Sequence, residues 1–240
     1  MSSSEKTALR IVALFQKFLG QSVLEVGGGL GQITDELVKI GCLTTVLEPD
    51  YLLFAELEKK FAGKESVTLI NKNVQGLLAK DDIQGLFDSV IYINVLEHIA
   101  DDCLELSMAG QTLRQEGHLI VFSPAIPFLY GSVDQLSHHY RRYTKSGLVD
   151  LVEQAGFQVQ TVEYFDFVGM LPYFLMYRVL KIQSIGSGGM YFYDNIILPI
   201  SSLLSRLTRK RIIGKNLLII AKKPNDPAKP SGHSKFGVLA

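Results

Sequence analysis

Short apolar runs alternate with amphipathic stretches along most of the chain. The runs predict strands at residues 22–26, 43–48, 66–74, 87–94, 118–124, 157–165 and 216–224. Helical spacing separates many of them: Ile33, Leu37 and Ile40 fall on one face of a helix, and Gly41 ends it. This alternation predicts an α/β fold, in which a mostly parallel sheet carries helices on both faces.

Three segments depart from the alternation. Residues 1–20 have the pattern of an amphipathic helix, and residues 167–207 form an apolar helical region interrupted by proline. Residues 225–240 are rich in Pro, Gly, Ser and Lys, which predicts a disordered tail. We therefore expect one domain over residues 1–224, with the apolar region as an insertion before the last strand. No apolar run reaches the roughly 18–20 residues that a membrane span needs.

Composition narrows the functional classes. The 240 residues include 24 Lys and Arg against 24 Asp and Glu, and this balance argues against a dedicated nucleic-acid binder. Cys42 and Cys103 are the two cysteines, and neither has a second Cys or His at metal-ligand spacing. A structural zinc site is therefore not expected, and a reducing, cytoplasmic location is.

A glycine loop follows the first predicted strand in the stretch LEVGGGLGQ, residues 24–32. Glycines there let backbone amides approach a ligand closely. Gln32 breaks the dinucleotide fingerprint, which disfavours an NAD oxidoreductase, and no Gly-Lys-Ser/Thr follows as a P-loop requires. Glu48 ends the next strand, where a carboxylate can accept hydrogen bonds from both ribose hydroxyls. The pattern favours a ligand that has a ribose but no pyrophosphate.

At this point the chain resembles the class I S-adenosylmethionine-dependent methyltransferases. The resemblance runs from about Val23 to Gly156 and rests on the motifs LEVGGGLG, VLEPD, FDSVIYINVLEHI and LRQEGHLIVFSP, in that order. It implies S-adenosylmethionine as cofactor and a Rossmann-like seven-stranded sheet whose last strand is antiparallel. His98, in LEHI, is expected to orient local backbone.

The same resemblance implies a set of cofactor-binding residues. Glu25 and the loop Gly27–Gly31 would hold the methionine part, Glu48 the ribose, and Asn73 the adenine, although the family usually has Asp there. Asn94 and Val95 would line the methionine pocket. The full predicted set is Glu25, Gly27, Gly28, Gly29, Gly31, Glu48, Pro49, Asn73, Val74, Asn94 and Val95.

Polar and aromatic residues follow the fifth predicted strand, at the sheet edge over which substrates approach. Asp134-x4-His139-x-Arg-Arg-Tyr143 resembles a methyltransferase subgroup associated with small molecules, quinone-like lipids and glycan- or lipid-linked substrates. His139 is a candidate base, and the two arginines can bind a carboxylate or phosphate; packing against the next helix is the alternative. The predicted substrate-binding residues are Tyr130, Asp134, His138, Arg141, Arg142 and Tyr143.

No metal site is expected at His138 and His139, because adjacent residues rarely converge on one ion and no carboxylate cluster accompanies them in the sequence. The Asp/Asn-Pro-Pro-Tyr/Phe motif of DNA amine methylation is absent after the fourth strand, where the chain has NVLE. We expect methylation of an oxygen in a small-molecule or lipid- or glycan-linked acceptor. Carbon and nitrogen acceptors, and a non-catalytic cofactor-binding protein, remain the alternatives.

The apolar insertion has three possible roles. It predicts a lid over a hydrophobic substrate, a contact in a homodimer, or a cover for the sheet. The basic run Arg206, Arg209, Lys210 and Arg211 fits weak attraction to a membrane surface with anionic lipid.

Overall fold

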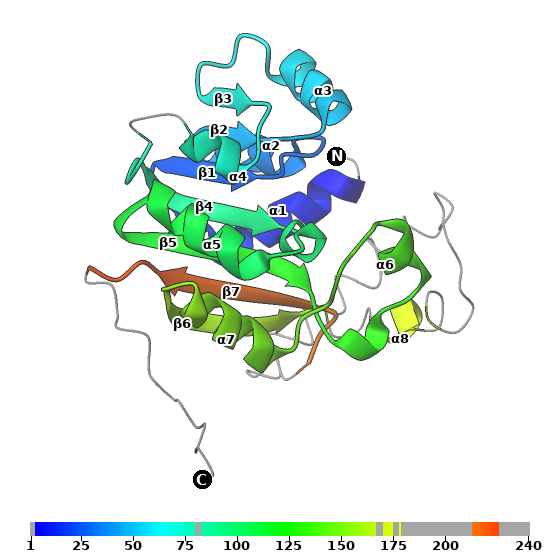
Figure 1. Cartoon of the computed structure of the whole chain (residues 1–240). Coiled ribbons are helices and arrows are strands. Elements are labelled where there is room, and N and C mark those ends of the chain that lie inside the picture. Colours follow the sequence, from blue (N-terminus) through cyan, green and yellow to red (C-terminus); the bar gives the residue numbers. More distant parts are fainter. Residues whose placement is uncertain (1–2, 80–82, 167–169, 175–177, 179–212, 226–240) are drawn as a thin grey trace.

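A seven-stranded sheet forms the centre of the computed structural model (Figure 1), which describes residues 3–79, 83–166, 170–174, 178 and 213–225. The strands occur in the order β3-β2-β1-β4-β5-β7-β6. Their bounds are Ser22–Val26 (β1), Leu43–Leu47 (β2), Val67–Ile70 (β3), Phe87–Ile93 (β4), Leu113–Pro124 (β5), Gln158–Phe165 (β6) and Asn216–Lys222 (β7).

The sheet has the predicted direction of strands. Strands β1 to β5 pair in parallel, and β7 lies antiparallel between β5 and β6. The chain order reverses where β1 has β2 on one side and β4 on the other. In open α/β sheets a ligand binds at such a reversal, beyond the carboxyl ends of the strands. The predicted α/β fold with an antiparallel last strand is confirmed.

Helices cover both faces of the sheet. One face carries α4 (Val74–Leu78), α5 (Asp102–Thr112) and α7 (Lys145–Gln154), and the other carries α1 (Ser3–Phe15), α2 (Gln32–Lys39) and α3 (Tyr51–Phe61). Alternate residues of β1 supply both cores: Leu24 packs with the first group and Val23 with the second. Strands buried on both faces read as nearly continuous apolar runs, which is why β1 and β4 were visible in the sequence.

Two predicted strands differ from the observed ones by more than two residues at one end. The third strand stops at Ile70 instead of residue 74, because the Asn73 side chain caps α4 by accepting a hydrogen bond from the Gly76 amide at 2.9 Å. The fifth strand starts at Leu113, five residues before the expected start, although Glu116 there has a positive φ of 65°. The added residues include the polar stretch Arg114–Glu116, so the apolar pattern of the sequence did not predict them as part of the strand.

The remaining described elements are short. They are the 3₁₀ turns Gln16–Phe18 (η1), Leu96–His98 (η2) and Pro127–Leu129 (η3), and the helices Ser132–Leu136 (α6) and Met170–Tyr173 (α8). Most of the predicted insertion, with its basic run, and the predicted tail from residue 226 lie outside the described residues. Among the described helices, none is long and apolar enough to cross a membrane.

Candidate functional site

A cavity of about 750 Å³ lies at the carboxyl ends of β1, β2 and β4, where the strand order reverses. Its volume is typical of sites for small ligands and cofactors. Its lining combines the ends of these strands with one side of α1, which covers it. The lining residues are Ser4, Thr7, Ala8, Ile11, Glu25, Gly27, Gly28, Gly29, Gln32, Ile33, Glu48, Leu53, Ile93, Asn94, Val95 and His98.

The glycine loop after β1 is shaped by positive φ angles and close neighbours. Gly27 has φ 78°, and a Cβ on it would lie 2.5 Å from a methyl carbon of Val95. Gly31 has φ 73° and would meet the Phe61 ring at 2.6 Å. Gly29 has φ 54° but faces open space, so its Cβ would meet nothing within 4 Å. The loop is packed tightly at both ends, and its middle is open toward a ligand.

Glu48 ties the end of β2 to the glycine loop. One carboxylate oxygen accepts the Gly29 amide at 2.8 Å, and the other accepts the Asp50 amide at 3.0 Å. Each oxygen has a second lone pair that a ligand hydroxyl can use. The Asn71 side chain donates to the Glu48 carbonyl at 2.7 Å and fixes this strand end. Asn71 has no motif of its own, so the sequence did not reveal this role.

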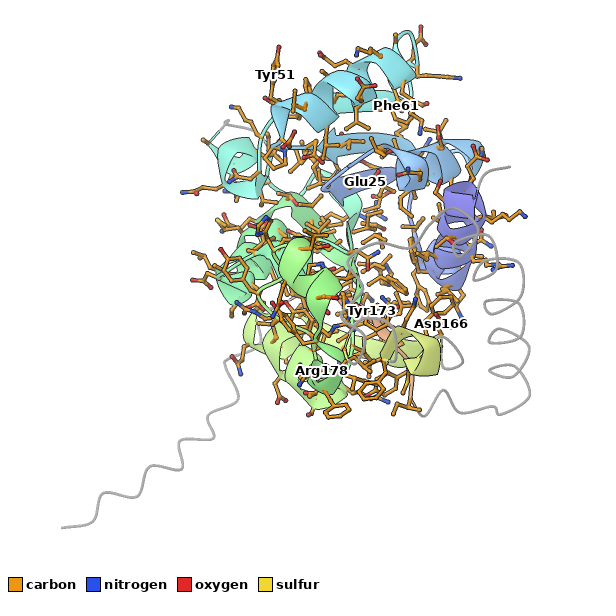
Figure 2. All side chains as sticks on the ribbon, turned by 90° about the vertical axis from the view of Figure 1, so that its right-hand side faces the viewer. Glu25, Tyr51, Phe61, Asp166, Tyr173 and Arg178 are labelled. Atoms are coloured by element: carbon orange, nitrogen blue, oxygen red, sulfur yellow. The ribbon has the colours of Figure 1, made fainter. Side chains whose placement is uncertain are left out.

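Glu25 lies in the sheet interior beneath the loop (Figure 2), with 3% of its surface exposed. Burial raises the pKa of its carboxyl to about 8. The Thr34 hydroxyl, which donates a hydrogen bond to it at 2.7 Å, lowers this pKa but does not offset the effect of burial. Glu25 lies in the cavity wall, so a cationic group of a bound ligand would favour the ionised form of its carboxyl.

Lys60 of α3 holds the loop from outside. Its ammonium donates to the carbonyls of Leu30 and Gly31, at 2.9 Å each, and forms an ion pair with Asp35 at 2.5 Å. This contact joins the end of the glycine loop to two helices. Sequence reasoning missed Lys60, because a lysine on an amphipathic helix carries no signal for a partner thirty residues away.

Most of the predicted cofactor residues line the cavity, and four do not. Glu25, Gly27, Gly28, Gly29, Glu48, Asn94 and Val95 contribute to its wall, while Gly31 shapes the loop behind it. Pro49 is not among the lining residues, the Asn73 oxygen is used in the cap of α4, and the Val74 side chain is fully buried in the core. The geometry therefore gives no support to side-chain contacts from Asn73 or Val74.

A second cavity, of about 600 Å³, adjoins the first. The predicted residues Tyr130, His138 and His139 line it together with Gln135 and Tyr140. His98 lines both cavities and marks where they meet. Gln135 and Tyr140 were not predicted, although both belong to the segment whose other members were.

His139 is held by a buried carboxylate. Its Nδ1 lies 2.9 Å from an oxygen of Asp134, whose surface is fully buried. Burial raises the pKa of Asp134, but hydrogen bonds from His139 and Arg142 outweigh it and bring that pKa below its usual value. An ionised Asp134 accepts hydrogen bonds only, so Nδ1 carries the proton. In neutral His139, Nε2 is then left as an acceptor.

Arg142 and Tyr143 are buried, and the partly exposed Arg141 binds protein groups. Arg142 is 7% exposed. It donates hydrogen bonds to Asp134 at 2.8 Å and to the Ala125 carbonyl at 3.2 Å, and it contacts the Tyr173 hydroxyl. Arg141 and the Tyr143 hydroxyl both bind Asp102, each at 2.8 Å. The geometry therefore does not support the prediction that Arg142 and Tyr143 bind a substrate. Their hydrogen bonds instead fix the segment to Asp102, at the start of α5, and to Ala125, after β5.

Glu97 adds a buried acid near the junction of the cavities. It is fully buried, its backbone carbonyl accepts the Tyr140 amide at 2.8 Å, and one carboxylate oxygen accepts the Ser123 hydroxyl at 3.1 Å. Burial raises the pKa of this carboxyl to about 7, although the charges of His139 and Arg142 lower it. The sequence placed Glu97 in a motif but gave it no role.

The fold, the open glycine loop and the acidic strand end define a class I, S-adenosylmethionine-dependent methyltransferase. Residues 4–162 match the model of the family described as "Methyltransferase domain", and the chain belongs to that family. The protein is an enzyme that uses S-adenosylmethionine.

Individual relatives are distant. A ubiquinone biosynthesis O-methyltransferase from Xanthomonas euvesicatoria pv. vesicatoria is 24% identical over 169 residues, which cover 64% of this chain and 70% of that protein. A SAM-dependent methyltransferase from Archaeoglobus fulgidus shares the fold at a TM-score of 0.62 and 19% identity, over 92% of this chain and 94% of that one. A 1,6-didemethyltoxoflavin-N1-methyltransferase from Burkholderia thailandensis was crystallised with S-adenosylhomocysteine. It shares the fold at a TM-score of 0.56 and 15% identity, over 92% of this chain and 79% of that one.

Proposed function

We propose that the enzyme methylates a hydroxyl oxygen of an uncharged, ring-containing acceptor, either a small molecule or the head of a lipid- or glycan-linked one. The observation that carries the proposal is the second cavity, which meets the glycine-loop cavity at His98. Two joined cavities suit a reaction between two ligands, because the transferred group must pass from one to the other at close range.

In this proposal the cofactor occupies the larger cavity. Its ribose hydroxyls bind Glu48, whose carboxylate is already oriented by two backbone amides. Its methionine part lies along the open middle of the glycine loop, between Glu25 and Val95. Leu53, at the start of α3, provides an apolar wall beside Glu48. The sulfonium then faces the junction at His98.

The acceptor occupies the smaller cavity. Five of its six lining side chains are aromatic or imidazole rings, and none of the six is a carboxylate, lysine or arginine. Such a wall favours flat, uncharged ligands through stacking and hydrogen bonds. The similarity to a ubiquinone biosynthesis O-methyltransferase supports oxygen as the acceptor atom.

His139 is the candidate for receiving the acceptor's proton. Asp134 fixes the proton on Nδ1, so Nε2 has a lone pair available. As the bond from the methyl carbon to sulfur breaks, the acceptor oxygen forms the new bond to that carbon and gives its proton to Nε2. The products are the methyl ether and S-adenosylhomocysteine, whose sulfur is now a neutral thioether.

Transfer of a labelled methyl group tests the proposal. The full chain is assayed against matched phenol and aniline acceptors that differ only in the reacting atom. We expect labelled product from the phenols, and a loss of about 10²–10⁴-fold in kcat in His139→Gln, the range for removal of a general base. Transfer to the anilines alone would contradict an oxygen acceptor. His118→Gln, on the sheet away from both cavities, is the matched control.

A further inference from the structure

Three side chains from two distant parts of the chain converge at the junction of the two cavities. Glu97, His98 and His139 each offer one oxygen or nitrogen atom, and these atoms lie within 4.8 Å of one another. The two imidazole rings meet edge to face, with centroids 4.6 Å apart. The cluster combines one carboxylate and two imidazoles, a donor set that proteins use for divalent transition metals.

Each member of the cluster is oriented by a second group. Asp134 holds Nδ1 of His139 at 2.9 Å, a hydrogen bond with the Ser137 backbone engages His98, and the Ser123 hydroxyl donates to Glu97 at 3.1 Å. Metal-binding histidines almost always donate their other ring N–H to a carboxylate or a backbone carbonyl. Both histidines are held in this way, and each keeps one nitrogen for the cluster.

Glu97 provides the second, independent observation. Its Oε1 is buried and has no hydrogen-bond partner in the described part of the chain. A buried acceptor without a partner costs free energy, so such atoms are rare and call for an explanation. A cation at the cluster supplies the missing partner.

We propose that Glu97, His98 and His139 bind a divalent transition-metal ion at the junction of the cofactor and acceptor cavities. Zinc donors lie about 2.0–2.2 Å from the ion, so the three side chains must close slightly around it. Three protein ligands leave a further position for a substrate or water, as in catalytic sites. Magnesium and calcium prefer oxygen donors and fit poorly.

This site differs from the one that the sequence disfavoured. His138 and His139 do not converge on one ion; instead, His139 meets a histidine and a carboxylate from the turn after β4. The sequence argued against a metal because no carboxylate cluster accompanies His138 and His139. In the fold, Glu97 brings a carboxylate next to His139.

The role of the ion rests on the proposed function. A hydroxyl bound to a divalent cation loses its proton more easily, as metal-bound water does. In the metal-bound enzyme Nε2 of His139 is a ligand and cannot receive the proton, which passes to solvent instead; His139 acts as the base only in the metal-free enzyme. The S–C bond to the methyl group then breaks as the O–C bond forms, and S-adenosylhomocysteine leaves with a neutral thioether sulfur.

Metal binding by the full chain tests the site without any acceptor. After treatment with a chelator and its removal, the protein is titrated with Zn²⁺ by calorimetry and with Co²⁺ by visible absorption. We expect one saturable site. Glu97→Gln and His139→Gln should weaken binding by at least about tenfold, because changes even beyond the ligands typically cost 10–100-fold. His118→Gln and His138→Gln should retain the wild-type affinity.

A measurement on the unchanged protein complements these variants. Co²⁺ should shift and broaden the imidazole signals of His98 and His139 in the NMR spectrum and leave those of His118 unchanged. Three outcomes would overturn the proposal: no saturable binding, wild-type affinity in both ligand variants, or a loss of affinity in His138→Gln as large as in the ligand variants. S-adenosylhomocysteine binding and the phenol assay, measured in parallel, show separately whether the proposed function fails.

Discussion

The amide of Gly29 donates a hydrogen bond to the Glu48 carboxylate at 2.8 Å, joining the loop after β1 to the end of β2. A single acidic side chain thus shapes the glycine loop, and in the proposed function it also offers acceptors to the cofactor's ribose. The two functions share one residue because β1 and β2 are neighbouring parallel strands that end at the same edge.

Replacing Glu48 should therefore weaken cofactor binding strongly. Glu48→Ala removes the acceptors for the ribose and releases the Gly29 amide, and hydrogen bonds to a charged group contribute about 1.5–3 kcal/mol each. We expect the Kd for S-adenosylhomocysteine, measured by calorimetry, to rise at least about tenfold. Glu56→Ala, which removes an exposed glutamate of α3, should leave it unchanged. Equal affinities of the two variants would show that Glu48 does not contact the cofactor.

The open middle of the glycine loop gives a second prediction. Gly29 and Gly41 both have positive φ and open space where a Cβ would lie, but only Gly29 lines the cavity. Gly29→Ala and Gly41→Ala should each destabilise the fold by about 1–2 kcal/mol, the usual cost of this conformation for a residue with a Cβ. Cofactor affinity should fall in Gly29→Ala alone. Thermal unfolding and calorimetry measure the two effects, and equal affinities would place the ligand away from this loop.

Glu25 predicts a stability that falls as the pH rises. Its pKa is raised to about 8 in the folded state, from an ordinary value of 4.5. Between these values the folded protein keeps a proton that the unfolded chain has lost, so the free energy of unfolding decreases by up to about 1.4 kcal/mol per pH unit. This contribution is fully present below pH 4.5 and levels off above pH 8.

Glu25→Gln separates this effect from binding. The uncharged side chain should make the ligand-free protein more stable than wild type at about pH 8, with a smaller difference at about pH 5, in denaturant titrations. It should also weaken S-adenosylhomocysteine binding if the ionised carboxylate meets the cofactor's ammonium. Thr34→Val serves as a control, because it removes the hydrogen bond and keeps the carboxyl. If the free energy of unfolding of Glu25→Gln changed with pH in the same way as that of wild type, the raised pKa of Glu25 would be contradicted.

The sequence was informative where one local pattern determines the structure. The apolar run of β4, buried on both faces, and the glycine loop before α2 were both recognisable, because each is a short segment with its own signal. The partners of those segments were not. Lys60 reaches the loop from thirty residues away, and the junction cluster joins His139 to a turn some forty residues earlier. Such pairings depend on how the strands are ordered, which no local pattern records.

The paired arginines show the same limit, and they give the last prediction. Their sequence fits an anion site, but Arg142 forms a buried ion pair with Asp134, whereas the side chain of Arg141 is 36% exposed. Removing one partner of a buried pair costs about 3–5 kcal/mol, while an exposed pair contributes about 0–1 kcal/mol. Arg142→Ala should therefore lower the free energy of unfolding by several kcal/mol in urea titrations, and Arg141→Ala by less than about 1 kcal/mol. If instead Arg142→Ala unfolded like wild type and lost only acceptor affinity, Arg142 would be a substrate ligand, as its sequence first suggested.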